Sequence, residues 1–140
     1  MQSMLEKAIN IASSAHFGQI DKGGAPYILH PLRVMFAVKT LEEKIVAVLH
    51  DIVEDTSISL NYLAEKGFSN EIISAIDVLT KRSGETRSEA AHRAKSNSIA
   101  RIVKIADVKD NLDLSRISNP SEKDYFRQKE YYAVLDILLG

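Results

Sequence analysis

One short segment, residues 50–55 with the sequence HDIVED, holds an imidazole and three carboxylates. If the segment is helical, His50 and Glu54 lie four residues apart, as do Asp51 and Asp55, so that all four groups share one broad flank. Such a cluster at the end of an apolar segment is costly, because like charges repel and burial raises carboxylate pKa values. A divalent cation would remove that cost. The segment therefore predicts a metal site, the alternative being a hydrated helix end.

Two further segments carry polar residues in apolar surroundings. His30 precedes Pro31 in PYILHP, where a histidine can also cap a helix through its ring. Asp107 lies in the segment KIADVKDN, and burial of an unpaired carboxylate there would be expensive. Its partner could be a basic neighbour, Lys104 or Arg101, or a metal ion.

The candidate ligands are His30, His50, Asp51 and Asp107. Two imidazole nitrogens and two carboxylate oxygens fit manganese, iron or zinc. The sequence contains no cysteine, so only histidine, aspartate and glutamate could hold such an ion. On a six-coordinate ion, four protein ligands leave positions for water and for a phosphate oxygen. That arrangement suits phosphoester hydrolysis, in which the metal polarises the phosphoryl group and lowers the pKa of water.

Helices joined by short polar loops are expected to position these residues. Apolar spacing and cap signals predict helices over residues 4–17, from 31 onward, and over 40–57, 59–67, 69–79, 86–95, 98–112 and 121–139. Capping boxes are expected at Thr40–Glu43, Thr86–Glu89 and Ser121–Asp124. The helix that begins after Thr40 is apolar on most sides and is expected to be central. Period-two alternation is weak, which predicts an all-α fold.

The composition limits the class of protein. A chain of 140 residues that is 45% hydrophobic predicts one domain, over 1–140, with its own core. A net charge of −1 argues against a nucleic-acid binder. No apolar run reaches the roughly 18 residues of a membrane span, and no basic segment followed by an apolar run opens the chain. We therefore expect a soluble cytoplasmic domain without membrane contact.

The order of these motifs resembles the HD-domain metal-dependent phosphohydrolases, and most closely the small stand-alone alarmone hydrolases of the RelA/SpoT type. The matching segments are AHFGQIDKGGAPYILHPLRV, AVLHDIVEDT, LTKRSGET and ARIVKIADVKDNLDLSRI, which together extend from residue 15 to residue 117. The resemblance implies a single all-helical HD bundle with a metal site, usually manganese, between its helices. It implies hydrolysis of the 3′-pyrophosphate of guanosine tetra- and pentaphosphate to pyrophosphate and GDP or GTP.

The resemblance also implies roles for single residues. The four candidate ligands would bind the metal ion, and Glu54 and Asp55 would orient or deprotonate the attacking water. Lys22 matches a position that contacts the guanine base, and Asn111 matches an asparagine near ribose and base. Arg127 and Tyr131 match contacts with phosphates in small members of the family. Apart from the resemblance, Lys104 shares a helix face with Asp107 and could reach a substrate phosphate or form a structural ion pair.

Three positions depart from the family pattern. Asp21 stands where many long members carry a basic residue, and Arg87 and Ala90 stand where stand-alone relatives carry a Tyr-x-x-Tyr pair. These departures keep two other hypotheses open: an HD phosphohydrolase for another nucleotide or a phosphomonoester, and a nucleotide-binding module without catalysis. Lys81, Arg82 and Arg87 could face a phosphate or solvent. The length leaves no room for the synthetase half of long alarmone enzymes, so synthesis is not expected.

Overall fold

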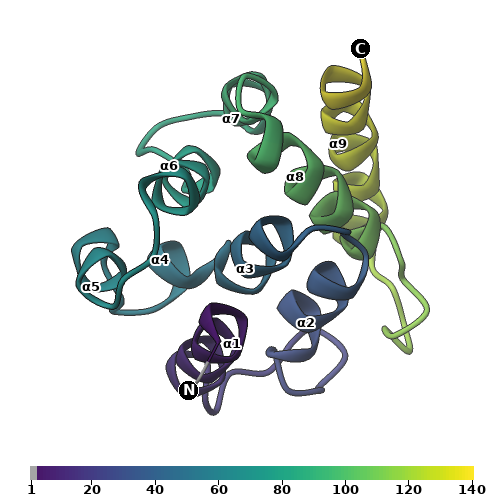
Figure 1. The fold of residues 1–140 in the computed structure, drawn as a ribbon. Coiled ribbons are helices and arrows are strands. Elements are labelled where there is room, and N and C mark those ends of the chain that lie inside the picture. The colour runs from purple at the N-terminus through teal and green to yellow at the C-terminus, as the bar shows by residue number, and fades with distance from the viewer. Residues whose placement is uncertain (1–2) are drawn as a thin grey trace.

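The structure, a computed structural model, describes residues 3–140 and is built from helices (Figure 1). The helices are α1 (Met4–Ala15), α2 (Leu29–Phe36), α3 (Leu41–Leu49), α4 (Ile52–Asp55), α5 (Leu60–Glu65), α6 (Asn70–Leu79), α7 (Arg87–Lys95), α8 (Ser98–Asn111) and α9 (Glu122–Leu139). Between residues 3 and 140, extended pairing is limited to an isolated bridge between Ile20 and Pro26. The predicted all-α class is confirmed.

Side-chain caps set the beginnings of several helices. At α3, the Thr40 hydroxyl accepts a hydrogen bond from the Glu43 amide at 3.1 Å, and the Glu43 carboxylate accepts one from the Thr40 amide at 3.0 Å. The same reciprocal box begins α7 and α9. Each box satisfies two amides that the first helical turn leaves without a partner. All three predicted boxes are therefore confirmed.

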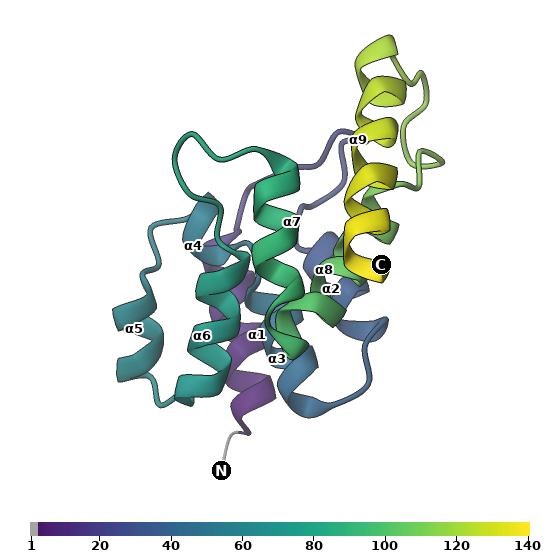
Figure 2. The ribbon, with the colours of Figure 1, turned by 90° about the horizontal axis from the view of Figure 1, so that it is seen from above.

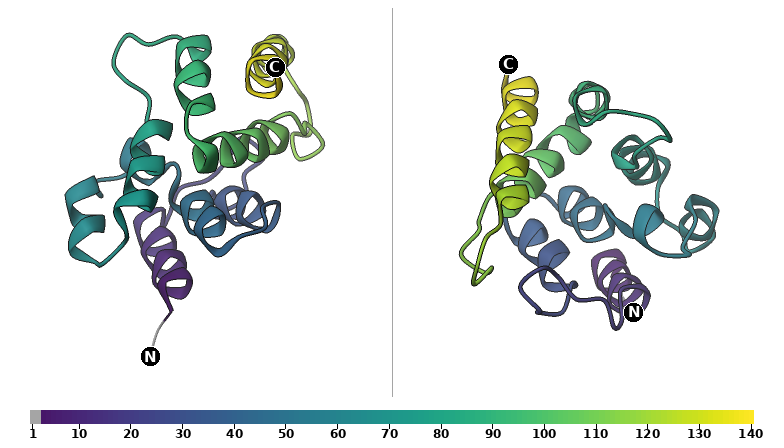
Figure 3. Two further views of the ribbon diagram at one scale, coloured as in Figure 1. Left: turned by 45° about the horizontal axis from the view of Figure 1, so that its top comes forward. Right: turned by 180° about the vertical axis from the view of Figure 1, so that it is seen from behind.

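Helix α3 occupies the centre of the fold. It packs against α1, α2, α6 and α8, and residues 45–49 are all buried (Figures 1 and 3). Helix α9 packs against α7 and α8 (Figure 2). A second group of buried side chains lies between these helices. No helix within residues 3–140 combines the length and the apolar character that crossing a bilayer requires. The ends of α2, α3 and α8 come together beside α9, and the candidate ligands lie there.

The prediction of one continuous helix through HDIVEDTS was wrong. Helix α3 ends at Leu49, His50 and Asp51 form a turn, and a separate four-residue helix, α4, follows. The helix breaks because the His50 side chain occupies a backbone carbonyl that a continuous helix would use as a hydrogen-bond acceptor. The His50 ring Nδ1 lies 2.5 Å from the Ala47 carbonyl oxygen, the atom to which the Asp51 amide would donate in a continuous helix.

The predicted boundaries of two other helices shift slightly. Helix α1 ends at Ala15 rather than near residue 17, and α2 begins at Leu29, so that Pro31 lies within its first turn. His30 therefore lies inside α2 and does not cap it; the residue before this helix, Ile28, makes no side-chain cap bond either.

Candidate active site

Three buried polar side chains from distant parts of the sequence meet inside the fold. His30 of α2, His50 at the end of α3 and Asp107 of α8 each offer a ligand atom within 4.8 Å of the others. His30 Nε2 lies 2.9 Å from Asp107 Oδ1, and His50 Nε2 lies 3.3 Å from the same oxygen. The structure thus brings together the three segments that the sequence singled out.

Asp51, the fourth candidate ligand, borders this cluster. Its Oδ2 lies 3.1 Å from His50 Nε2 and 3.8 Å from His30 Nε2. The same oxygen accepts a short hydrogen bond from the Tyr27 hydroxyl. Burial and the neighbouring Asp51 carboxylate raise the pKa of Tyr27, so the phenol keeps its proton and remains a donor. Tyr27 therefore holds the Asp51 carboxylate beside both imidazoles.

Both imidazole rings present Nε2 to the cluster. His30 Nδ1 lies 2.6 Å from Asp110 Oδ2, and His50 Nδ1 lies 2.5 Å from the Ala47 carbonyl oxygen. Because a carbonyl and an ionised carboxylate only accept, each Nδ1 carries the hydrogen, and each Nε2 is left to bind a cation. Metal-binding histidines in proteins are oriented in this way by an acceptor behind the ring.

The electrostatics of the cluster favour a cation at these nitrogens. Burial lowers the pKa of His30, but its hydrogen bonds to Asp107 and Asp110 outweigh that effect and raise it. Burial likewise opposes the charge of His50, yet Asp51 and Asp107 raise its pKa well above the ordinary value. A divalent ion meets the same demand with the same donor atoms. The buried histidine–aspartate cluster therefore indicates a divalent metal site.

Asp107 has two more partners on its own helix. Lys104 Nζ lies 3.0 Å from Asp107 Oδ2, and Asn111 Nδ2 lies 3.2 Å from Oδ1. Burial opposes the ionised form of Asp107, but the Lys104 ammonium and the His50 ring lower its pKa well below the usual range. Arg101, the other basic neighbour, instead donates to the Leu138 carbonyl at 2.7 Å.

Glu54 and Asp55 lie on α4, beyond the break that follows α3. Glu54 Oε1 accepts a hydrogen bond from the Lys81 backbone amide at 2.7 Å, which ties the end of α4 to the loop before α7. Partial burial, then the charges of Asp51 and Glu54, raise the pKa of Asp55. A carboxylate with a raised pKa is a better proton acceptor near neutral pH.

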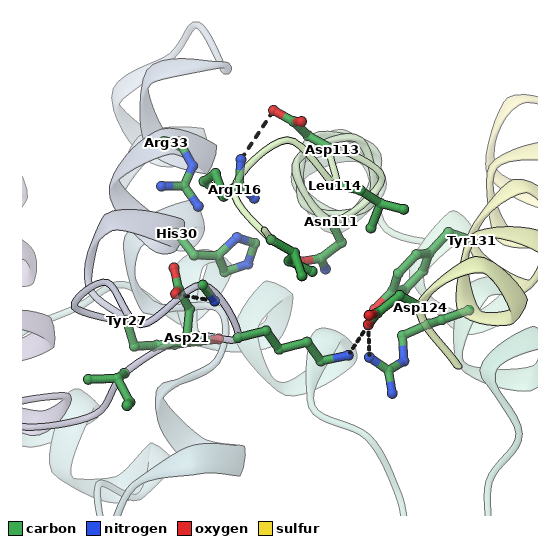
Figure 4. Close-up of a pocket in the computed structure, with 15 residues that line it drawn as sticks. Asp21, Tyr27, His30, Arg33, Asn111, Asp113, Leu114, Arg116, Asp124 and Tyr131 are labelled. Atoms are coloured by element: carbon green, nitrogen blue, oxygen red, sulfur yellow. Dashed lines mark hydrogen bonds and ion pairs between the residues drawn. The ribbon is translucent and has the colours of Figure 1, made fainter. Parts of the chain in front are cut away.

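Two cavities flank the cluster. The first, of about 300 Å³, lies between the loop over 18–26, the loop over 112–121 and α9 (Figure 4). Its lining includes four predicted substrate residues: Lys22, Asn111, Arg127 and Tyr131. The second, of about 250 Å³, is lined among others by His50, Asp51, Glu54, Lys81, Arg87, Lys104 and Tyr131. Tyr131 lines both cavities. Of the two histidines in the cluster, His30 lines the first cavity and His50 lines the second.

The first cavity has a charged mouth. Figure 4 shows Tyr27 and His30 on one side of it and Asp124 and Tyr131 of α9 on the other. Lys22 Nζ reaches across and lies 3.3 Å from Asp124 Oδ1. Elsewhere in the lining of this cavity, a Cβ at Gly23 would collide with the Arg116 carbonyl oxygen, so the two loops lie directly against each other.

No model of a known protein family matches the sequence. Over 156 residues the chain is 31% identical to a guanosine-3′,5′-bis(diphosphate) 3′-pyrophosphohydrolase of Spiroplasma citri, covering 97% of this chain and 20% of that protein. Over 146 residues it is 32% identical to a probable GTP pyrophosphokinase of Mycobacterium leprae, covering 95% of this chain and 18% of that protein. A solved structure of a metazoan ortholog of SpoT matches with a TM-score of 0.78 and 24% identity, covering 100% of this chain and 88% of the other. Over nearly its full length the chain is therefore similar to part of each of these proteins, and it shares the fold of the metazoan ortholog. It spans about a fifth of the length of the two curated relatives.

Two of the positions that depart from the family pattern have a clear role in this structure. The Asp21 carboxylate accepts hydrogen bonds from the amides of Gly23 and Ala25, both at 2.9 Å, and so holds its own loop in shape. The Arg87 guanidinium lies over the Tyr131 ring, 5.1 Å from its centroid, at the edge of the second cavity.

Two residues of the site were missed from the sequence. Tyr27 is not among the predicted site residues, and its hydroxyl donates a hydrogen bond to the Asp51 carboxylate. Asp110 is also absent from the predicted site residues, and its carboxylate accepts a hydrogen bond from His30 Nδ1. The three-residue spacing of Asp107 and Asp110 on one helix face was the available signal for Asp110.

Proposed function

We propose that this HD domain hydrolyses guanosine 3′,5′-bis(diphosphate) at its 3′-pyrophosphate, releasing pyrophosphate and GDP, and GTP from the pentaphosphate. The observation that carries the proposal is the pair of imidazoles that direct Nε2 at Asp107 with the Asp51 carboxylate beside them. The names of similar proteins support the choice of substrate. The Spiroplasma relative is named as this pyrophosphohydrolase, and the metazoan ortholog is described as hydrolysing ppGpp.

We assign the metal ligands as His30, His50, Asp51 and Asp107. Their mixed nitrogen and oxygen donors suit manganese, with iron and zinc as alternatives. When bound, such an ion supplies Lewis-acid polarisation of the phosphoryl group and lowers the pKa of water. The residues behind the ligands, Tyr27 and Asp110, hold two of them in position.

The chain's own carboxylates would carry out the proton transfer. Glu54 and Asp55 orient a water molecule toward the phosphorus that is bonded to the 3′ oxygen. The water oxygen forms a bond to this phosphorus, and a water proton passes to Asp55, whose raised pKa suits the role. The bond from phosphorus to the 3′ oxygen breaks, this oxygen takes up a proton from solvent, and pyrophosphate leaves.

The first cavity would bind the guanosine part of the substrate. Lys22 and Asn111 are assigned to the base and ribose, and Arg127 and Tyr131 to phosphate oxygens at the edge of the cavity; all four line it. Lys104, which neutralises Asp107 at 3.0 Å, is assigned to a phosphate on the side of the second cavity. The assignment needs no strongly basic protein, because a metal ion and a few local cations can bind one polyphosphate.

The test is release of pyrophosphate from guanosine 3′,5′-bis(diphosphate) by the purified chain with manganese. The His50→Ala, Asp51→Ala double variant is the control, because it removes two assigned ligands. Turnover by the wild type that the double variant lacks supports the proposal. Wild-type turnover no higher than that of the double variant refutes it, and tight nucleotide binding without turnover would indicate a binding module instead.

A second candidate function is hydrolysis of another nucleotide or of a phosphomonoester. Two observations favour it. Arg87 and Ala90 line the second cavity in place of the aromatic pair of stand-alone relatives. The Asp21 carboxylate accepts a hydrogen bond from the Gly23 amide in its own loop, where many long members carry a basic residue. A panel of nucleotides with and without a 3′-pyrophosphate distinguishes the two. A higher kcat/KM for a nucleotide that lacks this group would favour the second candidate.

A further inference from the structure

We propose that two copies of this chain associate through the outer face of α9, with the two helices antiparallel across a two-fold axis. The outer face consists of exposed residues only: Tyr125, Phe126, Lys129, Tyr132, Ala133, Asp136 and Leu139. The proposal is independent of the proposed function, because none of these residues lines either cavity beside the histidine–aspartate cluster.

Helix α9 carries large apolar side chains on two opposite sides. On the inner side, Val134, Leu135 and Leu138 are buried in the contact with α7 and α8. The helix lies at the edge of the molecule, and its outer side is turned to solvent (Figures 1 and 2). A helix that packs on one side only is expected to be polar on the other. The outer face of α9 departs from that rule.

The exposed apolar surface on this face is large enough for a weak, specific contact. The exposed fractions are 54% for Tyr125, 64% for Phe126, 58% for Tyr132 and 59% for Leu139. Because a buried aromatic side chain covers roughly 150–250 Å², these four side chains would bury roughly 400 Å² per copy and roughly 800 Å² in a pair. Stable interfaces bury roughly 1,200–2,000 Å². We therefore expect a reversible dimer that depends on protein concentration.

The spacing of the outer residues forms a continuous stripe along α9. Tyr125, Tyr132 and Leu139 follow one another at intervals of seven residues, and so do Lys129 and Asp136. Seven residues make nearly two helical turns, so each series forms a line along the helix. The two lines run side by side, because Lys129 lies four residues after Tyr125 and Asp136 lies four residues after Tyr132. This stripe is the geometry of a helix that packs against a second helix.

The two charges of the stripe have no opposite charge within their own chain. Among residues 3–140, no ion pair within 4.0 Å includes Lys129 or Asp136. The positions three and four residues away from either of them on α9, where a partner on the same helix face would lie, hold tyrosine, phenylalanine, alanine, leucine and glycine.

A second, antiparallel copy supplies the missing charges. Lys129 and Asp136 are equally far from the midpoint between Tyr132 and Ala133. If a two-fold axis passes through this midpoint, Lys129 of one copy lies opposite Asp136 of the second copy, and the same pair forms a second time. A parallel pair would instead place lysine against lysine and aspartate against aspartate, which is repulsive. The charges therefore select the antiparallel arrangement.

The same axis also matches the apolar side chains. Tyr132 meets Tyr132 of the second copy at the axis, and Tyr125 lies within one residue of the level of Leu139 of the second copy. Such a self-complementary patch is what a two-fold symmetric dimer requires. The contact leaves the inner side of α9 free, so Arg127 and Tyr131 still line their cavities.

The experiment is sedimentation equilibrium of the full chain from about 1 µM to about 1 mM. We expect a monomer–dimer equilibrium for the wild type. Asp136→Lys and Lys129→Asp each place like charges in both ion pairs, so each should raise the dissociation constant of the dimer at least tenfold. The double variant Lys129→Asp, Asp136→Lys restores opposite charges and should return this constant to within threefold of the wild-type value. An equal mixture of the two single variants should form a mixed dimer, because their charges complement each other.

Two controls separate the contact from general effects of charge and folding. Lys39→Asp reverses an exposed charge outside the outer face and should change the dissociation constant less than twofold, and the thermal unfolding midpoint of each variant reports its folding. The inference is overturned if the wild type remains monomeric at 1 mM, or if the single reversals leave the dimer unchanged. It is also overturned if the double variant stays as weak as the single variants, or if Lys39→Asp weakens the dimer equally.

Discussion

Replacement of Asp110 by asparagine should weaken metal binding although Asp110 is not an assigned ligand. Its Oδ2 lies 2.6 Å from His30 Nδ1, and its two oxygens accept from Arg33 at 2.8 and 3.1 Å. Burial opposes the charge of this carboxyl group, but the hydrogen bonds from His30 and Arg33 hold its pKa far below the usual range. Asp110 is therefore ionised at neutral pH and makes the His30 ring a stronger donor to a metal ion.

The expected magnitude follows from what asparagine keeps and what it loses. An amide oxygen can still accept from His30, but a hydrogen bond to an ionised acceptor is roughly twice as strong as a neutral one. Loss of such a partner behind a metal ligand lowers metal affinity by about 10- to 100-fold. Because the shape of the side chain is retained, we expect the lower end, about tenfold or about 1.4 kcal/mol.

The assay is calorimetric titration of the metal-free protein with manganese, far below the unfolding temperature. Asp113→Asn is the matched control, since Asp113 is exposed and its ion pair with Arg116, at 3.2 Å, does not touch His30. We expect less than a twofold change for this control and loss of binding for His30→Ala. Manganese affinity equal to wild type in Asp110→Asn, with binding lost in His30→Ala, would refute the reasoning.

Three further predictions follow from the same geometry. Tyr27→Phe removes the donor to Asp51, and because hydrogen bonds to charged groups contribute about 1.5–3 kcal/mol, manganese affinity in calorimetry should fall at least tenfold; an unchanged affinity would contradict the assigned role. Gly23→Ala should destabilise the fold by about 1–3 kcal/mol in urea unfolding, because its Cβ would meet the Arg116 carbonyl oxygen; wild-type stability would exclude that contact. The kcat/KM should fall as pH drops through the raised pKa of Asp55, because the protonated carboxyl cannot accept a proton from water; this acid limb should begin above the ordinary pKa range of an aspartate and be absent in Asp55→Asn.

Much of the local structure was predictable because its determinants are local. A capping box needs only a hydroxyl and a carboxylate three residues apart, so Thr40 with Glu43 marked the beginning of α3 without knowledge of the fold. The buried stripe of α3 was predictable for the same reason. The break after Leu49 was not, because it depends on the rotamer of His50, which turns Nδ1 back to the Ala47 carbonyl.

In the candidate site, too, the residues with local sequence signals were predictable and the contacts between distant segments were not. The sequence singled out His30 and Asp107 as polar residues in apolar surroundings and His50 as part of the HDIVED cluster, and the structure brings the three within ligand distance of one another. Contacts between side chains far apart in the sequence, such as Tyr27 with Asp51, could not be read from spacing. They depend on how α2, α3 and α8 pack, and no local pattern records that packing.

The ion pair across the mouth of the first cavity has a consequence for the timing of turnover. Lys22 is half exposed and reaches Asp124, the residue that also caps α9. The lysine end of the pair is open to solvent, which weakens the attraction between the two charges. The pair opens by rotation of a side chain, which takes picoseconds to nanoseconds in exposed residues, whereas loop and domain opening takes microseconds to milliseconds. Rotation of the Lys22 side chain therefore parts this ion pair without backbone movement, and in the proposed function we expect the chemical step or pyrophosphate departure, rather than separation of the pair, to set the rate.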